Sequence, residues 1–423
     1  MAGSTGTERV AVRHRFAGAW GWSVVLLVVA VALFYRALLR PPLDLQVYLL
    51  GGSIVIDRSD DLYAASAVTS AGLQFTYPPF AAVMFVPSAL VGLTVSSVVI
   101  VIVSLGCLIR MCYLVIVGTR FCDFYQVSVP TATVLASLAT VVAEPATTNF
   151  SLGQVNIILC WAVVEDVFGR RRWFSGALVG VAAGIKLVPA IFIVYFLLTR
   201  RWREAAVSFG VAAATVIVGA VMMPRSSRLY WSGLGELQNR VAGDPLKGDG
   251  LDQVGNQSVL GALHRLVGEE MRPVWVVMAT LILIIAGVRV WSVRGPDQAV
   301  ESVVVLALAG LLVSPVSWTP HWIWITPLVI VLLVRAKETP SALGWLGALL
   351  AAIWVFTVAI RLVWLGDGTG ADPEIAKYYR MLAANSYVLL AALSVAYLSW
   401  PTGRSVSAVT QRRKGQETGS PSA

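Results

Sequence analysis

The chain has little charge for its length of 423 residues. Only 13% of its residues are Asp, Glu, Lys or Arg, whereas 57% are hydrophobic and the mean hydropathy is +0.76. Because soluble globular domains carry about 25% charged residues, this composition excludes an ordinary soluble protein and predicts a polytopic membrane protein. The net charge of +9 does not indicate nucleic-acid binding, because the basic residues form short clusters between apolar runs, as they do in membrane proteins.

Several motifs are also missing. The three histidines lie far apart and the four cysteines form no CxxC pair, so neither a metal centre nor a disulfide framework is predicted. No small-residue cleavage site follows the first apolar run, so we expect that helix to be retained. No internal repeat is visible, which argues against an inverted-repeat transporter.

The apolar runs predict an all-α fold, because a spanning helix needs about 20 apolar residues. Candidate spans are residues 17–37, 76–93, 95–117, 130–144, 153–168, 174–198, 205–223, 273–292, 300–313, 321–335, 343–363 and 385–400. We therefore expect about 12 transmembrane helices in a domain of residues 17–400. A cytoplasmic segment, 1–16, precedes this domain, and a disordered cytoplasmic tail, 401–423, follows it.

Arginine clusters set the orientation, since cytoplasmic loops are rich in Lys and Arg. The clusters "GRRRW" (169–173) and "TRRWRE" (199–204) both read as cytoplasmic. The run 174–198 between them must then enter the membrane and return, which predicts a hairpin of two half-helices with Lys186 near its tip. Loops at about 38–75, 224–272 and 364–384 are expected on the outer face.

Asp44 follows the first predicted helix directly and so lies at the outer membrane boundary. It is either an interfacial helix-capping acid or a general base, and partial burial would favour the second role by raising its pKa. Tyr48, one helical turn later, shares its face. Tyr77, in "FTYPPF", is an interfacial aromatic or a substrate contact.

A polar cluster interrupts the apolar pattern at "EPATTNFSLGQVN", residues 144–156. It contains Glu144, Asn149, Gln154 and Asn156. Polar groups at membrane depth are costly and mark functional sites by default, and amides can bind sugar hydroxyls. The alternative is hydrogen bonding between helices.

Two basic side chains lie where an anion could bind. Lys186 interrupts an apolar run and requires an anion or a carbonyl partner unless it reaches toward the interface. His321 lies among Trp318, Trp322 and Trp324, which an aromatic belt would also explain. His321 can donate to a phosphate or transfer a proton.

Five fragments in order resemble one known family. They are "DLQVY", "FTYPPFAAVMF", "EPATTNFSLGQVN", "GIKLVPAIF" and "VSPVSWTPHW". The sequence is similar over about residues 17–400 to the actinobacterial polyprenol-phosphate-mannose-dependent α-(1→2)-mannosyltransferases, which have a GT-C membrane fold.

The resemblance implies transfer of mannose, with inversion, from polyprenyl-phosphate-mannose to a phosphatidylinositol mannoside, lipomannan or lipoarabinomannan acceptor in the cell envelope. Asp44 then matches the catalytic base, Lys186 and His321 hold the donor phosphate, and Trp318 stacks on a sugar. No cofactor is implied. Because leucines flank Asp44, a paired-acid metal site is not expected.

Other assignments stay open at this stage. Asn256, in the outer loop, is a candidate contact to acceptor hydroxyls. A polyprenyl-phosphate-pentose-dependent arabinosyltransferase differs only in donor selectivity, and a lipid transporter would use the same charges without chemistry. The acceptor is not readable from the sequence.

Overall fold

The computed structural model of the protein describes most of the chain between residues 42 and 400. The described ranges are 42–64, 68–70, 72–233, 250–268, 271–292, 298–339, 342–367 and 373–400, with five single positions between 25 and 39. The segments 1–16 and 401–423 and nearly all of the predicted first span lie outside the described residues.

The described residues form helices and no strand, apart from two isolated bridges. The first group of α-helices is α2 (Leu43–Ile56), α3 (Pro79–Met84), α4 (Val86–Val117), α5 (Phe121–Tyr125), α6 (Val129–Val142), α7 (Glu144–Leu152), α8 (Asn156–Phe168), α9 (Ala177–Ile185), α10 (Ile191–Leu198), α11 (Trp202–Met222) and α12 (Pro224–Ser232). The second is α14 (Val259–Leu266), α15 (Arg272–Ser292), α16 (Ala299–Val313), α17 (Ile325–Glu338), α18 (Ala342–Ala359), α19 (Pro373–Ala384) and α20 (Ser386–Ser399). Short 3₁₀ turns are η1 (Val188–Ala190), η4 (Thr319–Trp324) and η5 (Leu362–Asp367).

Several helices are long and apolar enough to cross a membrane, which confirms the predicted all-α membrane fold. The described residues contain five such helices, or up to seven if two bent helix pairs each count as one span. The spans are α4, α11, α15, α18 and η4 with α17, and the bent pairs are α6 with α7 and residues 378–384 with α20. The count of about 12 stays a prediction.

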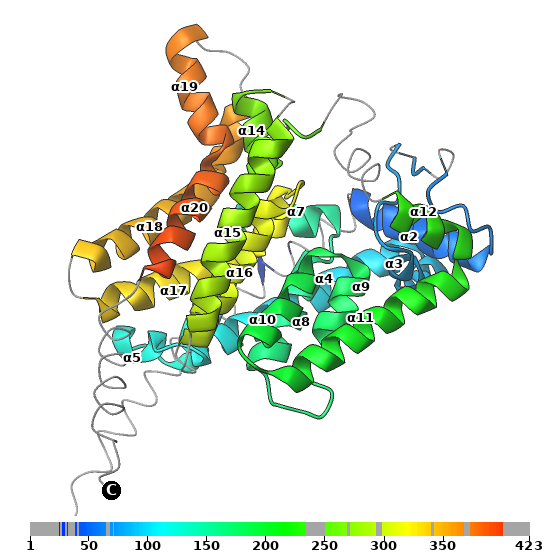
Figure 1. Cartoon of the computed structure of the whole chain (residues 1–423), viewed down its shortest axis with the longest axis horizontal. Coiled ribbons are helices and arrows are strands. Elements are labelled where there is room, and N and C mark those ends of the chain that lie inside the picture. The colour runs from blue at the N-terminus through cyan, green and yellow to red at the C-terminus, as the bar shows by residue number, and fades with distance from the viewer. Residues whose placement is uncertain are drawn as a thin grey trace, which may run out of the picture.

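The apolar surface is distributed as a membrane requires. In α16, 12 of 15 residues are buried, and it packs against α10, α15, α17 and α20 in the centre of the molecule (Figure 1). Helices α11 and α15 instead expose large apolar side chains, among them Phe209, Ile217, Val277 and Ile284. A helix that is apolar all round is buried in protein or lipid, so α11 and α15 contact lipid.

The predicted spans 76–93 and 95–117 differ from the structure. Residues Pro79–Met84 form only the short α3, and α4 runs from Val86 through the expected boundary. A kink occurs inside α4 at Gly92, whose φ is +79°, a conformation that glycine adopts without the Cβ penalty. The two predicted spans therefore form one long bent helix preceded by a short one.

The helix break at Lys186 is present. Helix α9 ends there because Lys186 has extended backbone (φ −148°, ψ 131°), and Pro189 starts the η1 turn before α10. The two ends of this segment meet, because Arg203 Nη2 donates to Arg172 O at 2.8 Å and Arg201 Nη1 donates to Val167 O at 3.1 Å. Residues 174–198 therefore form a hairpin that enters and leaves at one end of the molecule.

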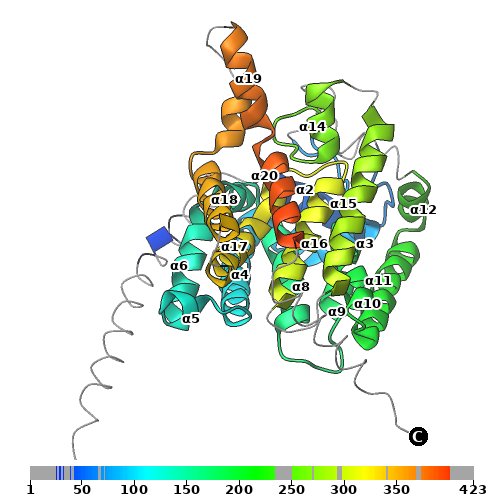
Figure 2. The ribbon, with the colours of Figure 1, turned by 60° about the vertical axis from the view of Figure 1, so that its left-hand side comes forward.

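We call this end the basic end, defined by the α8–α9 and α10–α11 connections (169–176 and 199–201). Arg110 and Glu165, which pair at 2.8 Å, bring the last part of α4 to it, and α5 follows there. Figure 2 shows α5 low in the view and α14 and α19 at the opposite end. Lys186, at the tip of the hairpin, lies away from the basic end.

Glycines allow the hairpin to pack tightly on α11. A Cβ atom at Gly180 would lie 2.6 Å from Ser208 O and 2.7 Å from Val211 Cβ. Gly176 and Gly184, each one helical turn away, also face α11. Small residues at this spacing let membrane helices approach closely, so this stripe holds the hairpin in place.

We expect Gly180→Ala to lower the thermal unfolding temperature of the detergent-solubilised protein, measured by tryptophan fluorescence. Overpacking of a tight contact costs about 1–3 kcal/mol. Gly210→Ala is the matched control, because a Cβ atom there meets nothing within 4 Å and replacing a helical glycine stabilises by roughly 0.5–1 kcal/mol. Equal unfolding temperatures for the two variants would contradict the tight α9–α11 contact.

Candidate functional site

A chain of hydrogen bonds joins Asp44 to His321 through three other side chains. Gln154 Nε2 donates to Asp44 Oδ2, and Asn156 Nδ2 donates to Gln154 Oε1. Lys186 Nζ lies 2.9 Å from Asn156 Oδ1 and 2.8 Å from His321 Nε2. Five of the residues predicted for the site are thus brought together from four separate segments.

The charges of Asp44 and Lys186 fix the direction of the hydrogen bonds between them. A carboxylate only accepts and an ammonium only donates. Gln154 must therefore turn its amide nitrogen to Asp44, and Asn156 must turn its amide oxygen to Lys186. The amide orientations, which otherwise have to be assigned, follow here from the two charges.

Helix α2 and the α7–α8 turn bring Asp44 to Gln154. Asp44 lies in the first turn of α2, where the helix dipole favours a negative charge. Gly153 ends α7 with a φ of +69°, and a Cβ there would lie 2.8 Å from Pro42 Cβ and 2.9 Å from Leu45 Cβ. The turn needs glycine both for its backbone and for this close approach.

Lys186 is half-buried and surrounded by acceptors. Besides Asn156 and His321, it faces the ring of Tyr77, whose centroid is 5.7 Å from Nζ. A lysine over an aromatic face is stabilised by the ring quadrupole. Two hydrogen bonds and one aromatic ring thus hold the ammonium group at the tip of the hairpin.

His321 is positioned by the packing of η4. The carbonyl of the preceding Pro320 accepts a bond of 2.7 Å from Asn149 Nδ2. The following Trp322 is fully buried, with ring centroids 5.5 Å from Tyr387 and 6.2 Å from Trp354. Asn149 therefore supports His321 through the backbone in this structure.

The two predicted tyrosines form a pair behind Lys186. Their hydroxyl oxygens are 3.2 Å apart, and Tyr48 stacks on Phe85 with centroids at 4.1 Å. Tyr63 donates to Tyr77 O at 2.6 Å. Tyr48 is fully buried, so here it supports Tyr77, while the half-buried Tyr77 reaches the site.

The electrostatics at Asp44 suit a proton acceptor. Asp44 lies in α2, which is not one of the spanning helices. Burial raises the pKa of its carboxyl above the ordinary value, and the bond from Gln154 and the charge of Lys186 only partly offset this. A carboxylate with a raised pKa is a stronger base.

Glu144 lies in a second polar cluster. It is fully buried and accepts from Thr148 Oγ1 at 2.9 Å, from Trp364 Nε1 at 3.0 Å and from Tyr387 O–H at 2.9 Å. These bonds tie α7 to η5 and α20. Glu144 begins α7, and Gln154 of the hydrogen-bond chain follows the end of α7. The two residues nevertheless belong to separate hydrogen-bonded clusters.

Asn256 and Trp318 lie in a third arrangement, beside α14. Asn256 is fully buried, and its amide bonds Ser317 N at 2.9 Å and Leu251 O at 3.0 Å. An isolated bridge pairs its backbone with that of the half-buried Trp318. These bonds hold the loop before α14 against the segment that precedes η4.

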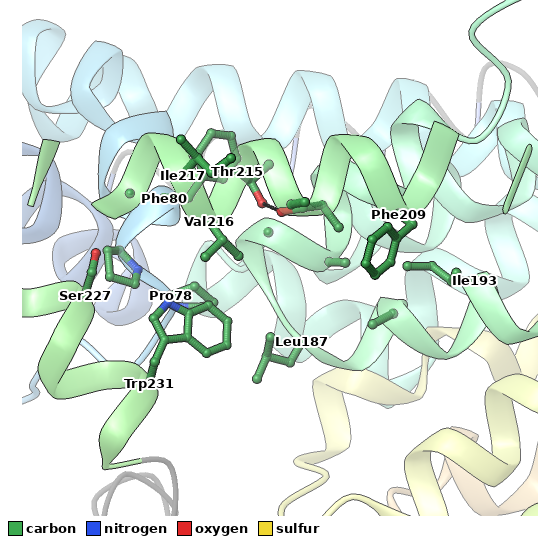
Figure 3. A pocket seen from close by; sticks show the side chains of 17 residues that line it. Pro78, Phe80, Leu187, Ile193, Phe209, Thr215, Val216, Ile217, Ser227 and Trp231 are labelled. Carbon is green, nitrogen blue, oxygen red and sulfur yellow. Dashed lines mark hydrogen bonds between the residues drawn. The ribbon is translucent and has the colours of Figure 1, made fainter. Parts of the chain in front are cut away.

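An apolar groove that the sequence did not indicate opens next to the site. Its volume is about 480 Å³, and it is adjacent because Pro78 follows Tyr77 and Leu187 follows Lys186. Figure 3 shows Trp231, Val216, Phe209 and Ile193 around it, contributed by α10, α11 and α12. Its lining residues are apolar, as expected in any membrane helix. Only the small residues at 183–184 and 212–213 could have indicated a groove in the sequence.

Asp60 and Asp61, in the connection after α2, bind α12. Asp60 accepts from Arg225 N at 2.7 Å and Ser226 N at 3.0 Å, and Asp61 pairs with the Arg225 guanidinium at 2.5 Å. Carboxylates stabilise a helix N-terminus in this way.

Among the described residues no three His, Cys, Asp or Glu side chains gather as a metal site.

Comparison with known proteins decides the family. The sequence profile of glycosyltransferase family 87 matches residues 75–315, a range that contains Gln154, Asn156 and Lys186. The chain belongs to this family.

The chain is also similar to mannosyltransferases of mycobacteria. A polyprenol-phosphate-mannose-dependent alpha-(1-2)-phosphatidylinositol mannoside mannosyltransferase of Mycobacterium tuberculosis is 33% identical over 407 residues, covering 89% of this chain and 91% of the relative. The protein of the same name from Mycolicibacterium smegmatis is 33% identical over 383 residues, covering 84% and 83%. A phosphatidylinositol pentamannoside mannosyltransferase of M. tuberculosis is 33% identical over 334 residues, covering 76% and 74%. No solved structure matches the chain significantly.

For this family member we expect Glu144→Gln to lower the unfolding temperature and to leave the Michaelis constant for acceptor unchanged. The new amide would face donors with its own N–H groups, and an unsatisfied buried group costs about 1–3 kcal/mol. Asp123→Asn, at an exposed carboxylate on α5, is the control. A raised acceptor Michaelis constant with unchanged stability would instead make Glu144 an acceptor-binding residue.

Proposed function

We propose that this chain is an inverting α-(1→2)-mannosyltransferase of the membrane. It moves mannose from polyprenyl-phosphate-mannose to a lipid-linked mannoside such as a phosphatidylinositol mannoside. The observation that carries the proposal is the hydrogen-bond chain that holds one carboxylate at one end and a lysine–histidine pair at the other. The names of the relatives favour mannose over the pentose-donor and transporter alternatives.

A single carboxylate suffices for this reaction. Inversion is one displacement, in which the acceptor oxygen attacks the anomeric carbon while the phosphate leaves. The phosphate needs no general acid because it leaves as a stable anion. Asp44, with its raised pKa, takes the proton from the acceptor hydroxyl.

Lys186 and His321 bind the donor phosphate and stabilise the charge that develops on it as the bond breaks. The amides of Gln154 and Asn156 set the spacing between this anion site and the base. Tyr77 and Trp318, both half-buried, line the approach for the sugars.

The groove takes the polyprenyl chain of the donor. Its lining is almost wholly apolar, and it includes Leu187 (Figure 3), the residue that follows Lys186 in the sequence. Its wall includes α11, whose outer surface contacts lipid, so a membrane-embedded chain can enter sideways.

The basic end faces the cytoplasm and the site faces the outer side. The basic end carries Arg170, Arg171, Arg172, Arg200, Arg201 and Arg203, and such clusters stay cytoplasmic. The hairpin tip, α7 and η4 lie away from that end, which supports a reaction on the outer face.

We expect Asp44→Asn to lower the rate of mannose transfer by roughly a hundred- to ten-thousandfold, since that is the usual contribution of a general base. The measurement uses purified protein in nanodiscs with polyprenyl-phosphate-mannose and a panel of phosphatidylinositol mannosides. Asp57→Asn, at the exposed C-terminal end of the same helix, is the control and should retain activity. Normal transfer by Asp44→Asn would exclude Asp44 as the base.

We expect Ala213→Trp, which fills the groove, to raise the Michaelis constant for the long-chain donor roughly tenfold, because each lost methylene contact costs about 0.8 kcal/mol. A donor with a short prenyl chain should be affected little. Ala214→Trp is the matched control, since Ala214 is exposed and does not line the groove. Equal effects on long and short donors would argue that the polyprenyl chain lies elsewhere.

A further inference from the structure

Lys186 and His321 meet nitrogen to nitrogen, at 2.8 Å. Both side chains are bases, and two positive charges at this distance would repel. An ammonium group has three donors and no acceptor. One of the two nitrogens must therefore carry a lone pair.

Basicity decides which nitrogen this is. The amine of Lys is the stronger base, with an ordinary pKa of about 10.4 against about 6.5 for the imidazole of His. Asn156 presents its amide oxygen to Lys186, because its amide nitrogen is bound to Gln154, and the ring of Tyr77 also faces Lys186, so both suit an ammonium group. Lys186 is therefore the charged donor and His321 Nε2 accepts. In this arrangement the His321 imidazole is neutral.

No carboxylate bonds to His321 within the described residues. Of the elements packed on η4, α7 contributes Glu144, whose oxygens are bound to Thr148, Trp364 and Tyr387. Helix α8 contributes Cys160, which lines a small cavity with His321 and Lys186. The charged groups of α16 and α17 lie at the basic end, where Glu301 pairs with Arg335 at 2.5 Å.

The proposed reaction changes the charge in front of this pair. The acceptor hydroxyl gives its proton to Asp44, the acceptor oxygen bonds the anomeric carbon, and the bond from that carbon to the phosphate oxygen breaks with its electron pair on the oxygen. The donor is a phosphodiester with one negative charge. The leaving group is a monoester that carries two above its second pKa of about 6.

We propose that His321 is a proton-accepting charge compensator, neutral while the donor is bound and protonated while polyprenyl phosphate is bound. The inference rests on the proposed function. The second negative charge of the monoester lies between Lys186 and His321 and removes their mutual repulsion, so a proton from solvent or from Asp44 is retained on the imidazole. The leaving phosphate is thereby stabilised, and its release requires loss of that proton.

The test is calorimetric titration of the full-length protein in nanodiscs, between pH 6.8 and 7.4, in two buffers of different ionisation enthalpy. The probes are polyprenyl phosphate and its methyl diester. We expect uptake of about one proton with the monoester and none with the diester. The dissociation constant of the monoester should then rise roughly tenfold per pH unit, while that of the diester stays constant.

His321→Gln should bind the monoester without proton uptake, whereas Asp44→Asn should keep the uptake. A second readout needs no variant: the chain has only three histidines, so the ¹⁵N signals of histidine-labelled wild type should show one imidazole becoming protonated with the monoester alone. Binding of the monoester without uptake, or uptake that survives in His321→Gln, would overturn the inference. Uptake lost in Asp44→Asn would place the proton on Asp44 and overturn it too. If neither probe binds, the proposed function itself fails.

Discussion

The polarity of one hydrogen-bond chain determines how the centre of this protein is built. An acceptor-only carboxylate stands at one end, a donor-only ammonium at the other, and two amides between them have a single consistent orientation. Four segments must be in place for this: the start of α2, the turn between α7 and α8, the break after α9, and η4. The remaining helices can be understood as the frame that holds these four segments together.

Polar clusters elsewhere in the molecule join helices to one another. At the basic end, Glu301 is shared by Arg289 at 2.8 Å and Arg335 at 2.5 Å, and Arg335 also binds the carbonyls of Leu398 and Trp400. This cluster joins α15, α16, α17 and α20. The Glu144 cluster does the same at the opposite end. In both, the carboxylate accepts from at least two protein side chains, whereas Asp44 is half-buried with a single side-chain donor.

Local patterns in the sequence predicted part of this. Hydropathy predicts the membrane fold. The hairpin is predicted by Lys186, which interrupts an apolar run between two arginine clusters. The polar residues that interrupt apolar runs include Asp44, Gln154, Asn156, Lys186 and His321, which the structure connects. Which of them bond each other was not predictable: Glu144 resembles Gln154 in sequence context, yet its partners Trp364 and Tyr387 lie 220 and 243 residues away. Such long-range pairing, like the groove, depends on tertiary packing and leaves no periodic signal. The kink at Gly92 lies next to the boundary predicted between the spans 76–93 and 95–117, but no sequence feature indicated that one helix continues across it.

The shortness of the hairpin has a consequence for biosynthesis. Its halves, α9 and α10, have 9 and 8 residues, so at about 1.5 Å per residue each covers roughly half of a bilayer core of about 30 Å. Neither half is long enough to insert alone, and much of the surface that holds them belongs to α11 and α16, which are translated later. His321 is later still. The Lys186–His321 pair therefore assembles only after about three quarters of the chain has been made, so a nascent or truncated chain carries Asp44 without the far end of its hydrogen-bond chain.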